Sequence, residues 1–181
     1  MTTPDTAAPV AAVGSSRRLR SLIVLGCVAV AVVALDQLTK HWVVTTIRPR
    51  MDAGEGPIVL LGGLVKFTYA ENTGAAFSMG TGYTWIFSVI AVAVVVVIVR
   101  SSRRLGSVWW AVALGGLLGG AIGNLIDRMT RMPGPGRGYV VDFIQLPHYA
   151  IFNVADSCIV GAGLLMVILA LRGVPFRGPT S

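Results

Sequence analysis

Four long stretches without a charged side chain dominate this 181-residue sequence. They lie between Arg20 and Asp36, Glu71 and Arg100, Arg104 and Asp127, and Asp156 and Arg172. A helix of about 20 apolar residues crosses the roughly 30 Å of a bilayer's hydrocarbon. The two middle stretches reach that length alone, and the outer two reach it with their flanks. The sequence therefore predicts an all-α membrane protein with four spanning helices, near residues 20–42, 83–100, 106–127 and 152–171.

Composition and charge placement support this class and give an orientation. With 54% hydrophobic and 13% charged residues, the chain is unlike a soluble globular domain. On one side of the predicted spans, eight of the 15 cations lie with one acid, Asp5, while the other seven cations and seven acids lie opposite. The whole net charge of +7 thus falls on one side, which the positive-inside rule assigns to the cytoplasm. Both termini are then cytoplasmic, and the basic surplus indicates no nucleic-acid partner.

The segments outside the spans have distinct compositions. Residues 1–16, rich in Ala, Thr, Pro and Ser, predict a disordered cytoplasmic tail. The four-span domain is expected over residues 17–172, and residues 173–181 are expected to form a second cytoplasmic tail. The first apolar run continues well past Cys27, which favours a retained span over a cleaved signal peptide. Cys27 and Cys158 fall in different spans, so no disulfide is expected.

An extracytoplasmic β region is expected over residues 45–82. Two apolar runs, Pro57–Leu61 and Leu64–Tyr69, flank Gly62-Gly63, which is typical of a β-hairpin. The fold class is therefore four transmembrane helices with a small outer β-hairpin or cradle. The Pro- and Gly-rich stretch 132–138 in the second outer connection predicts irregular structure.

Two carboxylates, Asp142 and Asp156, lie at the outer edge of the predicted bundle. An ionisable residue in a membrane span costs a few kcal/mol and is therefore a functional candidate. Asn153 and Asp156 are three residues apart and share a helical face. A buried, satisfied Asp156 and a plain loop charge at Asp142 are the structural alternatives. Together the two aspartates indicate acid–base chemistry on a water molecule at the membrane surface.

Other polar residues sit on helix faces. Asp36 and Lys40 are four apart and can pair, which favours an ordinary salt bridge at a helix end over direct chemistry. In the third span, small and polar residues recur every four positions and predict close helix approach: Gly116, Gly120, Asn124 and Gly119, Gly123, Asp127. Arg128 could pair with Asp127 or donate to a substrate carbonyl, and the sequence leaves both open.

Five motifs resemble, in order, those of the lipoprotein signal peptidase family, also called signal peptidase II. They are Asp36-Gln-Leu-Thr-Lys40, Glu71-Asn72-Thr-Gly74-Ala-Ala-Phe77, Gly119-Gly-Ala-Ile-Gly-Asn124-Leu-Ile-Asp127-Arg128, Val140-Val-Asp142-Phe143 and Phe152-Asn153-Val-Ala155-Asp156-Ser157. The resemblance covers about residues 20–171. It implies a four-span aspartyl protease of the bacterial inner membrane. Such enzymes cleave the signal peptide of a prolipoprotein on the N-terminal side of its diacylglyceryl-modified cysteine.

Carried over by motif, the resemblance implies a role for each of these residues. Asp142 and Asp156 would be the catalytic pair. The substrate site would be lined by Asn72, Asn124, Arg128 and Asn153. Supporting positions would be Asp36, Lys40, Gly74, Asp127 and Ala155. The implied partners are diacylglyceryl-modified prolipoproteins and membrane lipid, and we expect a monomer with its active site on the outer face.

The chemistry of the residues agrees with that assignment. Ionisation of both of two close carboxylates is unfavourable, so one is expected to keep a proton at neutral pH. The ionised one can activate water while the protonated one donates to the scissile carbonyl. No cofactor is expected, and neither His41 nor His148 has the spacing of a metal ligand.

Two rival functions remain weaker on the sequence. A small proton- or ion-coupled transporter would use the aspartates and the Asp36–Lys40 pair as a relay, but it needs carboxylates through the membrane depth. Here they crowd one edge. A non-enzymatic assembly factor would use the glycine faces and leave both late aspartates unexplained.

Overall fold

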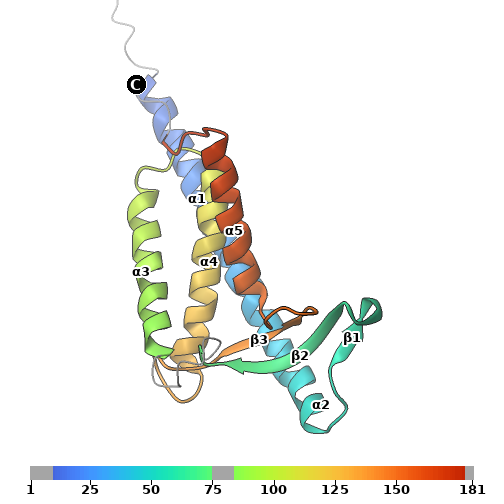
Figure 1. The fold of residues 1–181 in the computed structure, drawn as a ribbon. Coiled ribbons are helices and arrows are strands. Elements are labelled where there is room, and N and C mark those ends of the chain that lie inside the picture. The colour runs from blue at the N-terminus through green and yellow to red at the C-terminus, as the bar shows by residue number, and fades with distance from the viewer. Residues whose placement is uncertain (1–9, 75–83, 178–181) are drawn as a thin grey trace, which may run out of the picture.

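Four long helices and a small sheet make up the fold (Figure 1). The computed structural model describes residues 10–74 and 84–177. The helices are α1 (Val10–Trp42), α3 (Thr84–Ser102), α4 (Val108–Thr130) and α5 (Val154–Leu171), and each is long and apolar enough to cross a membrane. The sheet lies at one end of the bundle, and the start of α1 and the end of α5 lie at the other. The predicted fold class is confirmed.

The ends of α1 differ most from the predicted boundaries. The helix begins at Val10, so residues 10–16 of the segment expected to be a disordered tail are helical. Residues 1–9 and 178–181 of the two predicted tails lie outside the described residues. At its other end α1 continues through a π-helical turn, Val43–Ile47, into α2 (Arg48–Asp52), so the β region starts later than residue 45.

Tertiary packing explains this helical extension. Val43 and Ile47 are fully buried and share a cluster with Val141 and Phe143, which are nearly 100 residues further along the chain. Burying such side chains stabilises the extra turns by roughly 1.5–3 kcal/mol each. A local pattern in residues 43–52 carries no sign of these distant partners.

The outer β structure is a three-stranded antiparallel sheet, not a hairpin alone. β1 (Ile58–Leu60) pairs with β2 (Val65–Asn72) as predicted, and β3 (Val140–Gln145) adds on the other side of β2. Gly62 in the turn has a φ of +65°, which favours glycine. The pairing of β2 with β3 sets Ala70 opposite Asp142. It thereby joins two segments that lie about 70 residues apart in the sequence.

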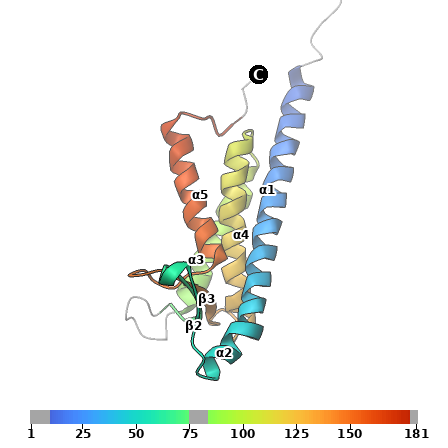
Figure 2. The same cartoon turned by 90° about the vertical axis from the view of Figure 1, so that its right-hand side faces the viewer.

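α4 is the central helix and packs between α1 and α5, with α3 on a further side (Figure 2). A Cβ at Gly119 would lie 2.7 Å from the carbonyl oxygen of Ala29 in α1. A Cβ at Gly120 would lie 2.6 Å from the carbonyl oxygen of Ala155 in α5. Both distances are too short for a side chain. The prediction that glycines allow close helix approach is confirmed, with one glycine row facing each neighbouring helix.

The outward faces of the helices are apolar. α3 and α5 expose large hydrophobic side chains along their lengths: Trp85, Ile90, Val97, Val160, Leu164 and Leu171. Such a continuous apolar surface is unusual on a soluble monomer and suits lipid.

We expect Gly120→Ala to lower the free energy of unfolding by about 1–3 kcal/mol, because the added methyl group meets backbone. Gly161→Ala in α5 is the matched control, since no atom lies within 4 Å of its Cβ position. Its effect should be within about 1 kcal/mol and stabilising, as alanine favours helix. Thermal unfolding in detergent measures both, and equal losses would contradict the close packing of α4 on α5.

Candidate active site

Asn153 connects the two predicted catalytic aspartates, although they come from different elements. Asp142 lies in β3 and Asp156 in the first turn of α5. The Asn153 Nδ2 donates to Asp142 Oδ1 at 2.7 Å. Asn153 also caps α5: its Oδ1 accepts from the Asp156 backbone N–H at 2.9 Å, and its own N–H donates to Asp156 Oδ2 at 3.2 Å. This capping box fixes both carboxylates around one residue.

Two further asparagines complete the hydrogen bonding of the pair. Asn72 Nδ2 donates to Asp142 Oδ2, and Asn124 Nδ2 donates to Asp156 Oδ1, both at 2.8 Å. The orientation of each side-chain amide follows from the hydrogen bond that its oxygen accepts. Asn72 Oδ1 accepts from the Gly74 N–H, and Asn124 Oδ1 accepts from the Lys40 ammonium, which can only donate. Each carboxylate is thus held by two N–H groups.

Gly74 has a conformational reason to be glycine. Its φ is +87°, in the left-handed region, and a Cβ there would overlap the Phe87 ring of α3. The turn at Gly74 directs its N–H back to Asn72. Residues 75–77, the rest of that motif, lie outside the described residues.

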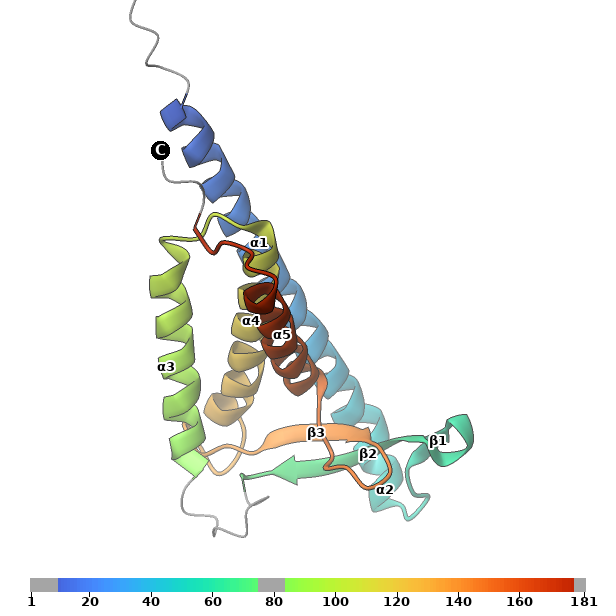
Figure 3. The same ribbon diagram turned by 45° about the horizontal axis from the view of Figure 1, so that its top comes forward.

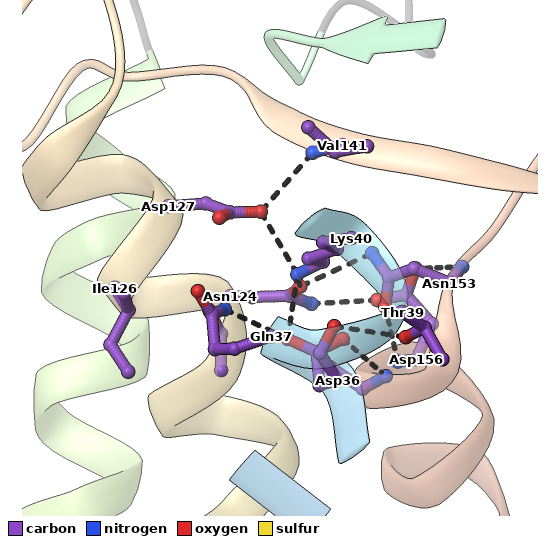
Figure 4. A network of polar contacts seen from close by, with 12 residues as sticks. Asp36, Gln37, Thr39, Lys40, Asn124, Ile126, Asp127, Val141, Asn153 and Asp156 are labelled. Atoms are coloured by element: carbon purple, nitrogen blue, oxygen red, sulfur yellow. Dashed lines mark hydrogen bonds and ion pairs between the residues drawn. The ribbon is translucent and has the colours of Figure 1, made fainter. Parts of the chain in front are cut away.

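Lys40 is fully buried among Asp36, Asn124 and Asp127 (Figure 4). Its Nζ lies 2.9 Å from each of three acceptors: Asp36 Oδ2, Asp127 Oδ2 and Asn124 Oδ1. An ammonium has three N–H bonds, so this geometry satisfies all of them. The Asp36–Lys40 pair expected at a helix end is therefore part of a larger buried network that joins α1 to α4.

The two carboxylates around Lys40 also hold backbone of the aspartate-bearing elements. Asp36 Oδ1 accepts from the Ala155 N–H at 3.0 Å, at the start of α5. Asp127 Oδ2 accepts from the Val141 N–H at 3.2 Å, next to Asp142 in β3. Asp36 therefore helps to fix the position of Asp156, and Asp127 helps to fix the position of Asp142.

Arg128 does not pair with Asp127. Asp127 forms ion pairs with Lys40 and Arg131, the latter at 2.8 Å. The Arg128 guanidinium lies 5.2 Å from the centre of the Phe87 ring. Its Nη1 is buried and has no hydrogen-bond partner among residues 10–74 and 84–177. An unsatisfied buried donor costs about 1–3 kcal/mol, and a carbonyl oxygen placed there would recover that energy.

Burial sets the protonation of Asp142. Its side chain is 1% exposed, and this desolvation raises the pKa of the carboxyl from 3.8 to about 6. The charge of Asp156 adds to the rise, and the amides of Asn72 and Asn153 oppose it. The pair therefore holds one proton more firmly than a free carboxyl does.

Asp156 reaches an open, apolar hollow. It is half-buried and borders a cavity of about 250 Å³ together with Tyr149, Phe152 and Val160. One carboxylate is thus enclosed and the other is accessible from the surface. No cluster of three or more His, Cys, Asp or Glu side chains that could hold a metal occurs within the described ranges.

Sequence reasoning missed Arg131 and Gly138. Arg131 stands four residues after Asp127, the same helical spacing that suggested the Asp36–Lys40 pair. Gly138 donates its N–H to the Arg128 carbonyl at 3.0 Å and turns the chain from α4 into β3. A Cβ there would lie 2.6 Å from the Asp127 carbonyl oxygen. The Gly-rich composition of residues 132–138 was the available signal.

The signal peptidase (SPase) II family matches residues 28–172, which include every polar residue of this site. The chain belongs to the signal peptidase II family. It is therefore a peptidase of bacterial membranes, with four apolar helices. The resemblance recognised in the motifs is confirmed.

Individual relatives agree with the family. The chain is 49% identical to the lipoprotein signal peptidase of Mycobacterium avium (strain 104) over 160 residues, covering 88% of this chain and 84% of the relative. It is 45% identical to that of Mycolicibacterium smegmatis over 173 residues, covering 96% and 72%. A solved structure titled as a bacterial membrane enzyme at 1.9 Å superposes with a TM-score of 0.68 at 29% identity, covering 81% of this chain and 91% of that one.

Lys40→Met should lower the free energy of unfolding by about 3–5 kcal/mol, because it leaves Asp36 and Asp127 buried without their cation. Arg50→Met is the matched control, since its ion pair with Glu55 is solvent-exposed and contributes at most about 1 kcal/mol. Thermal unfolding in detergent compares the two. Similar losses in both variants would mean that the Lys40 network does not stabilise the site.

Proposed function

We propose that this chain is an aspartyl endopeptidase that removes signal peptides from diacylglyceryl-modified prolipoproteins, cutting on the N-terminal side of the lipid-bearing cysteine. Membership of the signal peptidase II family supports the signal-peptide substrate. The observation that carries the aspartyl mechanism is the connection of Asp142 to Asp156 through Asn153.

Asp142 and Asp156 have different environments, which suggests different roles. The enclosed Asp142, with its raised pKa, keeps the proton that polarises the scissile carbonyl. Asp156 borders the hollow and accepts from Asn124 and from backbone at the α5 N-terminus, an environment that favours negative charge. Asp156 is then the base that takes a proton from the attacking water.

The surrounding residues supply substrate contacts. The unpaired Arg128 Nη1 donates to a backbone carbonyl of the signal peptide. The apolar cavity beside Tyr149 and Phe152 borders the lipid-facing surface of α5, so the diacylglyceryl chains of a bound substrate can stay in the lipid. Asn72 and Asn124 orient the two carboxylates toward the bound peptide.

The charge pattern supports an outward-facing site. The arginine-rich end of the bundle lies opposite the sheet, and the positive-inside rule places it in the cytoplasm. Both termini are then cytoplasmic, and a monomer holds all the groups named. The transporter alternative gains nothing, because the described carboxylates all lie toward the sheet end and the spans' other halves carry none.

Asp142→Asn and Asp156→Asn should each reduce kcat by about 100-fold or more, because an amide can be neither the base nor the acid. The double variant should be scarcely worse, as the pair acts as a unit. The assay is loss of the signal peptide from a diacylglyceryl-modified prolipoprotein by purified chain in detergent, followed on gels. Asp52→Asn, at an exposed carboxylate, is the control. Near-normal turnover in either single variant would remove that aspartate from the mechanism.

The pH profile should be bell-shaped, with its alkaline limb near the Asp142 pKa of about 6. Activity needs the protonated form, so it is lost as pH rises through that value. Asn72→Ala removes a hydrogen bond that lowers this pKa, and the limb should therefore move to higher pH. Profiles of kcat/KM test this, with Glu71→Gln on the opposite strand face as control. An unmoved limb in Asn72→Ala would assign the titration to another group.

A further inference from the structure

The end of the bundle away from the sheet contains a cavity of about 600 Å³ that the peptidase chemistry does not use. Four arginines line it: Arg100, Arg103, Arg104 and Arg177. The first three come from the end of α3 and the turn before α4, and Arg177 comes from the segment after α5. We call this cavity the arginine pocket.

Specific contacts hold the C-terminal segment in place to form the pocket. After α5, the chain runs back beside the α3–α4 turn (Figure 3). The Gly106 N–H donates to the Phe176 carbonyl at 3.1 Å, and the Trp110 indole N–H donates to the Val174 carbonyl at 2.9 Å. The rings of Trp110 and Phe176 meet edge-on, with centroids 5.5 Å apart. These hydrogen bonds and the ring contact therefore hold Arg177 next to the other three arginines.

The four positive charges are not compensated within the described residues. None of these arginines forms an ion pair with a carboxylate there, and the described acids lie at the other end of the bundle or in the sheet region. Like charges gathered in one open cavity repel each other, and an anion bound between them relieves that repulsion. The pocket thus has the electrostatics of an anion site.

The remaining walls indicate what kind of anion fits. Val97, Leu114 and Phe176 give the pocket an apolar side, and Val97 lies on the lipid-facing surface of α3. Guanidinium groups bind phosphate oxygens with paired N–H donors. A phospholipid has a phosphate for the arginines and an acyl chain for the apolar side. A small free anion would leave the apolar side unfilled.

We propose that the arginine pocket binds the headgroup of an anionic phospholipid, with one acyl chain along Val97 and Leu114. Basic pockets between spanning helices at a membrane face are typical sites for such headgroups. In the orientation proposed above, the lipid belongs to the cytoplasmic leaflet. Bound there, it joins α3 to α4 and to the C-terminal segment at the end opposite the aspartates.

Native mass spectrometry of the delipidated full-length chain in neutral detergent tests the proposal. Phosphatidylglycerol should bind about tenfold or more tightly than phosphatidylcholine, which has the same chains but no net charge. Glycerol 3-phosphate, the headgroup chemistry without chains, should bind far more weakly than phosphatidylglycerol. Equal binding of the two lipids, or equal binding of glycerol 3-phosphate, would overturn the proposal.

Matched variants locate the site. Replacing Arg100, Arg103, Arg104 and Arg177 together by Gln should abolish the preference for phosphatidylglycerol. The control replaces four arginines at the same end that do not line the pocket, Arg17, Arg18, Arg20 and Arg172, and should keep it. All eight side chains are exposed, so folding should survive, and the melting temperature without lipid checks this. If both variants lost the preference for phosphatidylglycerol equally, the preference would come from general positive charge, and the proposed site would be wrong.

Discussion

The burial of Lys40 is the constraint on which the rest of this structure depends. An ammonium removed from water at a membrane edge costs several kcal/mol unless anions surround it. Here Asp36, Asp127 and the Asn124 amide oxygen complete its three hydrogen bonds. Because these acceptors come from α1 and α4, satisfying one cation fixes the relative height and rotation of two helices.

The same network also positions the aspartate pair. The second oxygen of Asp36 holds the Ala155 N–H, and Asp127 holds the Val141 N–H. One contact positions the first turn of α5 and the other positions β3. The relative positions of Asp142 and Asp156 are therefore set by backbone hydrogen bonds to Asp36 and Asp127, two carboxylates that take no part in the proposed chemistry. Such supporting contacts preorganise a reactive site.

Sequence reasoning identified most of the helices and polar residues because their signals are local. Charge-free runs gave the spans, and the i, i+4 spacing placed Asp36 with Lys40 on a common helix face. The expectation that Asn153 and Asp156 share a helical face was wrong: Asn153 is the extended N-cap residue of α5, and the spacing of three is that of a capping box. The extended run around Asp142 was also recognised, but its pairing with β2 and the helical extension over Val43–Ile47 were not predicted. Both form through contacts between segments about 70 to 100 residues apart, such as Ala70 with Asp142, and no local periodicity encodes such pairings.

The glycines on α4 serve the site as well as the packing of the helices. As sequence, they predicted only close helix packing. A Cβ at Gly123 would lie 2.6 Å from Asp36 Oδ2, and one at Gly120 would meet the carbonyl of Ala155. A side chain at either position would push aside an oxygen or a turn that the aspartate network uses. Packing and chemistry therefore share these residues: because α4 lies so close to α1 and α5, Lys40 of α1 reaches Asp127 of α4 and Asp36 reaches the start of α5.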